Sequence, residues 1–379
     1  MRYFQELWLA WLGTISVGVV SVVSSMVLPG AIAEESVANF TNLCLQRERL
    51  DAESQHAINV LLEKAKTSDC GEADRFFLSS PYLTLNDANL SDIGILSSFP
   101  HLTKLFLGGN QIEDLTPLAT LSNLQTLSLN DNLISDLTPL SQLVNLKKLL
   151  IDRNRVRDLT PLSNSIALED LSLESNEIQN LQPLTILVNL THLTLAGNQI
   201  EDVRSLSGLV RLQTLSLDSN KISDIEPLSA LVQLESLNLT ANQIVEIHPL
   251  IELTQLVELN LENNLISEEN RLEVERSVNL KKLQNTNICK ACNFVGVDFS
   301  NSDLIGVYLE GANLAGANLE NADLVGANLE NANLSGANLA GADLTSAVLK
   351  NANLEGANLK EAYLCNAILP DGNSVECSP

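Results

Sequence analysis

The histidines and cysteines are the side chains of this sequence with the clearest capacity for catalysis or metal binding. The four histidines stand far apart, at His56, His101, His192 and His248. Only His192 has suitable neighbours, because Asp170 and Thr214 lie 22 positions before and after it and Ser172 lies 20 before it, offsets close to the repeat described below. A serine nucleophile with a histidine base needs such a set, but no strained turn or anion-binding glycine loop accompanies it. We therefore interpret His192 as a surface residue and predict a protein that is not an enzyme.

The segment Cys289–Cys292 (CKAC) could act as a redox pair or as half of a zinc site. A redox motif of this kind normally opens a helix, and zinc needs two further ligands that the neighbouring sequence lacks. An even number of cysteines in an exported chain favours disulfides, so we expect a structural Cys289–Cys292 bond. A metal or redox role, and free or otherwise paired thiols, remain the alternatives. Proximity in sequence favours Cys44–Cys70 and Cys365–Cys377 as the other two bonds.

Composition and charge exclude several function classes. The chain of 379 residues carries 47 acidic and 22 basic side chains, a formal charge of −25. Such a charge repels phosphate backbones and anionic lipid surfaces, so we predict no nucleic-acid partner. No phosphate-binding loop, paired-acid site or dinucleotide motif occurs, which predicts no cofactor and no metal. Aromatic residues make up only 4% of the chain while hydrophobic residues make up 45%, which indicates a core of many small aliphatic layers.

The N-terminus carries an export signal. Leu7–Leu28 is an almost uncharged run, and Pro29, Gly30 and the segment 31–33 (AIA) follow it. This pattern predicts a signal peptide over residues 1–33, with an uncleaved membrane anchor as the alternative and no other membrane contact. We expect a periplasmic, cell-surface or secreted protein whose cysteines oxidise.

A period of 22 residues organises the middle of the chain. Asparagine recurs in one frame at Asn110, Asn132, Asn154, Asn176, Asn198, Asn220, Asn242 and Asn264. Leu or Ile stands five and three residues before each asparagine, which is the alternation of a short strand. We expect the stacked asparagines to bond backbone groups at the turn after each strand. Carboxylates or Asn four residues later, as at Asp136 and Asn180, are expected to cap the next turn rather than to catalyse.

The pattern LxLxxNxIxDLxPL resembles the 22-residue class of leucine-rich repeats found in internalins and related secreted bacterial proteins, over residues 82–284. The resemblance implies a horseshoe segment with a concave sheet. Residues 34–81 precede it and contain one predicted amphipathic helix, Asp51–Lys66, so we interpret them as a helical cap on the first repeat. Residues 285–291 are expected to form a linker or cap.

A second array, over residues 292–371, repeats every five residues. The segment 310–329 reads EGANLAGANLENADLVGANL, with a central leucine in each pentad and alanine two positions before it. Four pentads can form one square coil, with leucine and alanine inside and Asn or Asp outside. This array resembles the pentapeptide-repeat family, which implies a right-handed quadrilateral β-helix, followed by a tail at 372–379. Acidic pentapeptide columns that resemble DNA are a less favoured reading, because the export signal places this chain in another compartment.

The sequence thus predicts a mainly β solenoid, poor in α/β structure, that binds a partner instead of catalysing a reaction. We expect a monomeric, exported interaction scaffold with a protein or envelope glycan as partner and with the β-helix as a spacer or second contact. A purely structural envelope protein is the alternative. The resemblance to solenoids of cyanobacterial envelopes suggests the setting. The residues predicted to meet the partner are Tyr82, Lys104, Phe106, Lys148, Leu150, Arg153, Asp170 and His192.

Overall fold

The computed structural model describes residues 39–377. The predicted signal segment, residues 1–33, lies outside this range. No helix within 39–377 is both long and apolar enough to cross a bilayer.

Three short α-helices precede the repeats: α1 (Phe40–Leu45), α2 (Ala52–Ala65) and α3 (Cys70–Leu78). The sequence predicted only α2, whose N-cap is Asp51 as expected, with a side chain that accepts from the Ser54 N–H. Helices α1 and α3 are too short to show a clear period. They are held by packing, because Phe40 and Phe77 are buried beside Phe99 of the first repeat.

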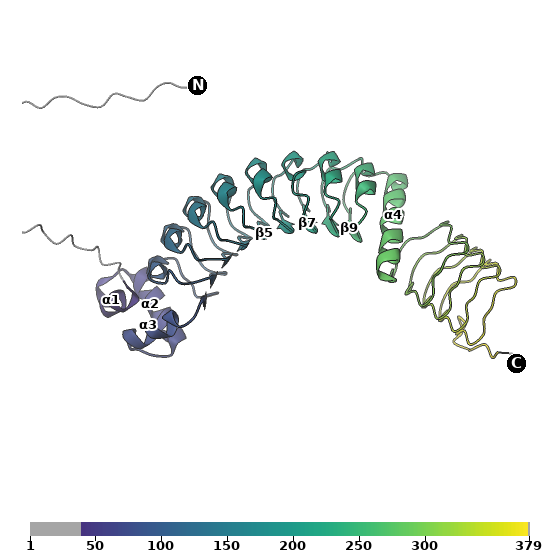
Figure 1. The fold of residues 1–379 in the computed structure, drawn as a ribbon, viewed down its shortest axis with the longest axis horizontal. Coiled ribbons are helices and arrows are strands. Elements are labelled where there is room, and N and C mark those ends of the chain that lie inside the picture. Colours follow the sequence, from purple (N-terminus) through teal and green to yellow (C-terminus); the bar gives the residue numbers. More distant parts are fainter. Residues whose placement is uncertain (1–38, 378–379) are drawn as a thin grey trace, which may run out of the picture. The chain divides into compact units, whose positions relative to one another are not determined.

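Nine parallel strands, each of three residues, form one sheet in sequence order (Figure 1). They are β1 (Tyr82–Thr84), β2 (Lys104–Phe106), β3 (Thr126–Ser128), β4 (Lys148–Leu150), β5 (Asp170–Ser172), β6 (His192–Thr194), β7 (Thr214–Ser216), β8 (Ser236–Asn238) and β9 (Glu258–Asn260). The opposite side of the array carries 3₁₀-helices: η2 (Gly94–Ser98), η3 (Thr116–Thr120), η4 (Thr138–Gln142), η5 (Thr160–Asn164), η6 (Gln182–Ile186), η7 (Arg204–Leu206), η8 (Glu226–Ala230) and η9 (His248–Glu252). A proline lies in the first turn of six of these eight helices: η3–η6, η8 and η9. Proline is tolerated in the first turn but not in a helix interior, so these helices stay short. The strands line the inner side of the curved array.

The asparagine ladder joins successive repeats. The carboxamide nitrogen of Asn132 donates to the Leu107 and Leu129 carbonyls at 3.0 Å each, and its oxygen accepts from the Ile112 N–H at 2.9 Å. Each side chain thus bonds its own turn and the preceding one, which leaves the buried backbone groups there satisfied.

The expected turn caps are present. Asp136 accepts from the Thr138 N–H at 2.8 Å, and Asn180 accepts from the Gln182 N–H at 3.0 Å. Hydrogen bonds from the Thr138 side chain and from its backbone N–H lower the pKa of Asp136. These side chains cap the turns, as the sequence predicted.

Helix α4 (Glu268–Thr286) was not expected. The repeat pattern predicted leucine-rich repeats up to residue 284. In the structure the frame of 22 ends after Asn264, and a helix follows the N-cap Ser267, whose side chain accepts from the Asn270 N–H. Val274 and Val278 pack into the core of the repeats. Leu283 packs into the core of the second array, so one helix closes both cores.

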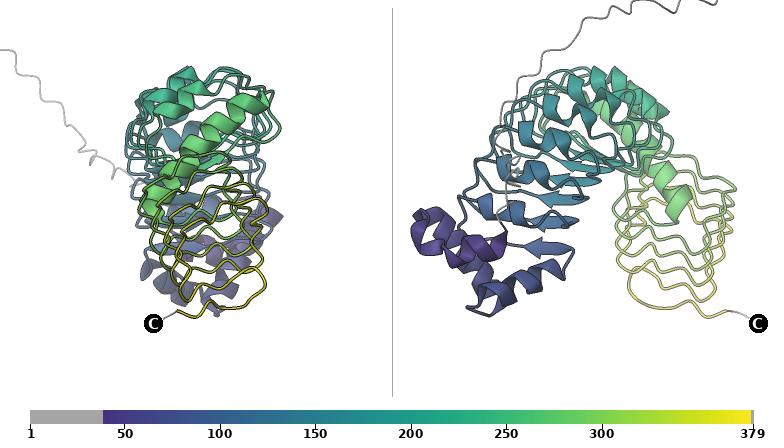
Figure 2. Two further views of the ribbon diagram at one scale, coloured as in Figure 1. Left: turned by 90° about the vertical axis from the view of Figure 1, so that its right-hand side faces the viewer. Right: turned by 60° about the vertical axis from the view of Figure 1, so that its left-hand side comes forward.

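The second array forms a column of stacked coils (Figure 2), and the 20-residue spacing of its bridges corresponds to four pentads in each coil. Parallel bridges join residues 20 apart, such as Asn313 and Asn333. Leu314 and Leu334 are fully buried at the centre, as the spacing predicted. On the outside, the Asn333 carboxamide donates to the Asn313 oxygen at 3.1 Å, which adds a second ladder.

All six cysteines form disulfides in the pairs expected: Cys44–Cys70, Cys289–Cys292 and Cys365–Cys377. The first joins α1 to α3, and the last ties down the end of the column. Cys289 is fully buried between α4 and the first pentads, so this bond is structural.

Candidate binding surface

The side chains that point outward from the sheet form two straight rows across the concave face, because the strands pair in register. The first row contains Tyr82, Lys104, Thr126, Lys148, Asp170 and His192 in that order. The second row contains Thr84, Phe106, Ser128, Leu150, Ser172 and Thr194. Seven of the eight residues predicted to meet a partner therefore lie in these rows, and Arg153 lies in the turn after β4. The register brings these side chains onto one surface.

Apolar side chains gather at the N-terminal end of the concave face. Tyr82 is 60% exposed at the edge strand β1. Phe106 and Leu150 are partly exposed, and between them lies Ser128, a small side chain that is 8% exposed. The register places Ser128 directly between Phe106 and Leu150 in the second row, so a small polar side chain separates the two apolar ones. A partner that contacts this row meets both apolar side chains without any rearrangement of the sheet.

Two of the predicted basic residues are neutralised by neighbouring repeats. Lys148 forms an ion pair with Asp170. The Arg153 guanidinium donates to both carboxylate oxygens of Asp131, at 2.5 and 2.7 Å, and this bond lowers the pKa of Asp131. Among residues 39–377, Lys104 has no ion-pair partner, so its charge is the more available one for a ligand.

The residues around His192 do not form a catalytic set. The His192 Nδ1 atom lies 2.9 Å from the Thr191 hydroxyl. The Ser172 hydroxyl donates to Asp152 at 2.5 Å, and Asp152 also accepts from the Glu174 N–H at 2.8 Å. Ser172 thus supports a link between repeats. Within the described chain, no group of three or more His, Cys, Asp or Glu side chains is arranged to hold a metal ion.

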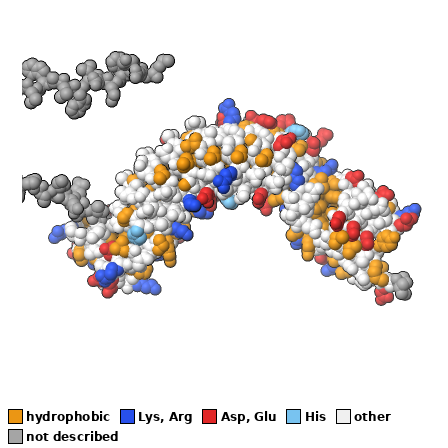
Figure 3. Space-filling view, in the orientation of Figure 1, with side chains coloured by type: hydrophobic (Ala, Val, Ile, Leu, Met, Phe, Trp, Pro, Cys, Tyr) orange, Lys and Arg blue, Asp and Glu red, His pale blue; other side chains and the backbone are white. Residues whose placement is uncertain are grey.

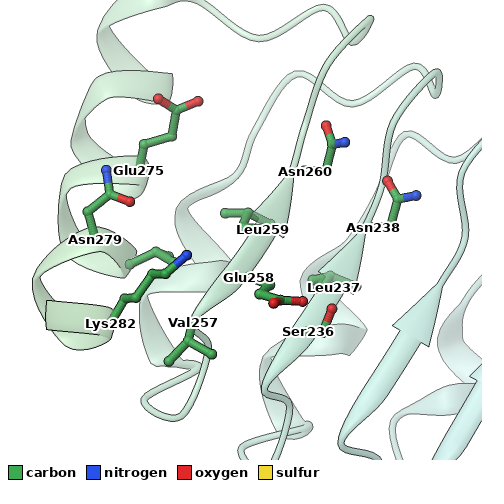
Figure 4. Close-up of a pocket in the computed structure, with 11 residues that line it drawn as sticks. Ser236, Leu237, Asn238, Val257, Glu258, Leu259, Asn260, Glu275, Asn279 and Lys282 are labelled. Carbon is green, nitrogen blue, oxygen red and sulfur yellow. The ribbon is translucent and has the colours of Figure 1, made fainter. Parts of the chain in front are cut away.

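A cleft of about 400 Å³ lies at the other end of the sheet, between strands β8 and β9 and helix α4 (Figure 4). Glu258 and Asn260 face it from β9, and Glu275, Asn279 and Lys282 face it from α4. This cleft was not predicted from the sequence, because α4 was not predicted. The signal was present as Ser267 followed by a polar run with Val274 and Val278 four residues apart, which is the spacing of one helix face.

A stripe of exposed β-branched residues lies outside the concave face. Its members are Val144, Ile166, Val188, Val210 and Val232, which are 43–57% exposed, one in each of five successive repeats between a 3₁₀-helix and the next strand. Figure 3 shows apolar side chains spaced along the array in this manner. Single apolar residues of this size are common on protein surfaces, and the stripe offers matched controls for the concave face.

Comparisons with known proteins identify both arrays. The leucine-rich repeat families match residues 82–120, 122–164, 166–222 and 210–252, and the pentapeptide repeat family matches residues 292–331 and 332–371. The crystal structure of internalin C2 from Listeria monocytogenes is similar at 33% identity and a TM-score of 0.50, over 54% of this chain and 91% of that one. That of an internalin (inlF) from the same organism is similar in fold, at 24% identity and a TM-score of 0.51, over 74% of this chain and 89% of that one. No curated protein matches in sequence.

Proposed function

We propose that this chain, a leucine-rich repeat array joined to a pentapeptide-repeat column, is an exported scaffold that binds a protein partner on the concave face of β1–β4. The observation that carries the proposal is the pair Phe106 and Leu150, held partly exposed on either side of Ser128 beside the exposed Tyr82. Aromatic and aliphatic anchors next to a charged residue are typical of the residues that dominate binding energy. Lys104 supplies that charge.

Rigidity supports this proposal. The strands are joined by backbone bonds and by buried asparagines, so a partner meets side chains that are already in place. Binding to such a surface requires little ordering of loops, and more of the contact energy appears as affinity. The pentapeptide column then acts as a rigid spacer or as a second contact.

Export is supported by the cysteines. All six are paired in disulfides, and such bonds form and persist in oxidising compartments. A purely structural envelope protein is the competing function, because the rest of the concave face is small and polar. An envelope glycan is the competing ligand.

The proposal is tested by affinity capture from an envelope extract with the full chain as bait. The wild type is expected to retain one defined protein in a saturable manner, and the Phe106→Ala, Leu150→Ala variant is expected to lose it. Loss of two anchors of this type typically weakens binding by roughly a hundredfold.

The control is Val144→Ala, Ile166→Ala, which removes two exposed apolar side chains from the stripe outside the concave face. It should retain the partner. Equal capture by both variants would reject the concave-face assignment, and the absence of any saturable partner would favour the purely structural function.

A further inference from the structure

We propose that the cleft between β8, β9 and α4 binds the cationic end of an arginine or lysine side chain of the partner. The partner is the protein bound in the proposed function. Only the identity of the partner rests on that function. The cleft lies on the same concave sheet as the apolar anchors, so one partner could use both.

The shape of the cleft suits a long side chain. Leu237, Leu259 and Val278 are among the residues that line it, and they supply apolar contacts. The methylene stem of lysine or arginine packs well on such a surface while the charged end seeks polar groups. Its volume of about 400 Å³ is at the small end of ligand sites, which suits one or two side chains.

The polar groups of the cleft suit a cation. Glu258 lines it from β9, near Ser236, and Glu275 lines it from α4, and neither has an ion-pair partner among residues 39–377. Burial raises the pKa of the Glu275 carboxyl, an effect that Arg271 partly offsets. A guanidinium paired with the Glu275 carboxylate would restore the interactions that burial removes, Glu258 offers a second carboxylate on the β9 side, and the Asn260 and Asn279 carboxamides offer further acceptors.

Lys282 allows the charge preference of the cleft to be tested. Its ammonium lines the same cleft without an ion pair to either glutamate. It therefore repels a bound cation and would attract an anion. Removal of this charge should strengthen the binding of a cation, whereas a site for an anionic ligand would respond in the opposite direction.

The charge of the whole chain favours the same ligand. A formal charge of −25 attracts basic surfaces and speeds their encounter with the protein. The cleft then provides a specific place for one basic side chain within this general attraction.

The experiment titrates the purified full chain with N-acetyl-arginine methylamide, followed by ligand-observed NMR. N-acetyl-citrulline methylamide is the matched probe, since it has nearly the same shape and no charge. The arginine probe should bind and the citrulline probe should bind roughly tenfold more weakly. N,N′-diacetylchitobiose is the third probe, because carboxamides and carboxylates also recognise sugars.

Four variants locate the binding. Glu258→Gln, Glu275→Gln and the double variant should weaken the arginine probe, by roughly tenfold in the double variant. Lys282→Met should strengthen it. Glu201→Gln is the control, because Glu201 is an exposed carboxylate on a turn far from the cleft in sequence, and it should leave the affinity unchanged.

Equal binding of arginine and citrulline probes, or equal effects of Glu201→Gln and the cleft variants, would overturn the proposal. Binding of the disaccharide in preference to arginine would instead assign the cleft to a glycan. These probes need no partner protein, so failure here leaves the Phe106 and Leu150 experiment as an independent test of the proposed function.

Discussion

Substitution of Asn176 by alanine removes one complete step of the ladder. The Asn176 side chain is 7% exposed. Its carboxamide nitrogen donates to the carbonyls of Ile151, Leu173 and Glu174 at 2.9, 3.1 and 3.2 Å, and its oxygen accepts from the Val156 N–H at 3.0 Å. Alanine can replace none of these bonds, and the small cavity that it leaves lies between two repeats.

The expected loss follows from these four contacts. A hydrogen bond contributes about 0.5–1.5 kcal/mol net, and a buried group left without a partner costs about 1–3 kcal/mol. The Val156 N–H loses its acceptor. The carbonyls of Ile151, Leu173 and Glu174 each lose one donor. We therefore expect Asn176→Ala to lower the free energy of unfolding by about 3 kcal/mol.

The assay is urea denaturation followed by circular dichroism, with Asn145→Ala as the matched control. Asn145 is exposed and makes one side-chain bond, to the Ser122 carbonyl at 2.9 Å. Its removal should lower the free energy of unfolding by less than about 1 kcal/mol. A loss for Asn176→Ala no larger than that for the control would refute the ladder as the link between repeats.

Three further predictions concern stability. The Cys44→Ala, Cys70→Ala variant opens a loop between residues 26 apart and should destabilise the protein by about 3.5 kcal/mol by the chain-entropy relation. The Cys289→Ala, Cys292→Ala variant, with a separation of 3, should lose less stability in the same denaturation assay. The reverse order would contradict this prediction. Hydrogen bonds from the Arg204 side chain and backbone N–H lower the pKa of Asp202 from 3.8 to about 2, so its stabilising contribution is complete above the unfolded pKa and is lost as the pH falls toward 2. Asp202→Asn should therefore show a smaller fall in Tm between pH 5 and pH 2 than the wild type, and an equal fall would count against this pair. Ala241 has a φ of 55°, so Ala241→Gly should raise the free energy of unfolding by about 0.5 kcal/mol after the entropy of glycine is included; a loss of stability would show that the methyl group matters more than the strain.

The repeated parts of this fold could be predicted from the sequence because each coil places the same residue in the same environment. The 22-residue frame predicted the ladder, the turn caps and the outward rows, and the five-residue frame predicted the buried leucines of the column. The disulfide pairs followed from proximity in sequence together with the predicted export signal.

The parts outside the frames could not be predicted in the same way. Helix α4 follows the last ladder asparagine, and its register is set by contacts with two different cores. Lys148 and Arg153 each form an ion pair with a charged residue 22 positions away. The frame shows which residues are neighbours, but the structure is needed to show that their side chains meet. The cleft needs both β9 and α4, and so it appears only in the structure.

Hydroxyl-radical footprinting of the complex with the captured partner tests the central claim most directly. The method reports the exposure of individual side chains, and Tyr82, Phe106 and Leu150 are reactive types on the concave face. Oxidation of these three should fall when the partner is added, while that of Val188 and Val210 outside the concave face should stay the same. Protection of the two valines with unchanged oxidation of Tyr82, Phe106 and Leu150 would contradict a partner site on the concave sheet.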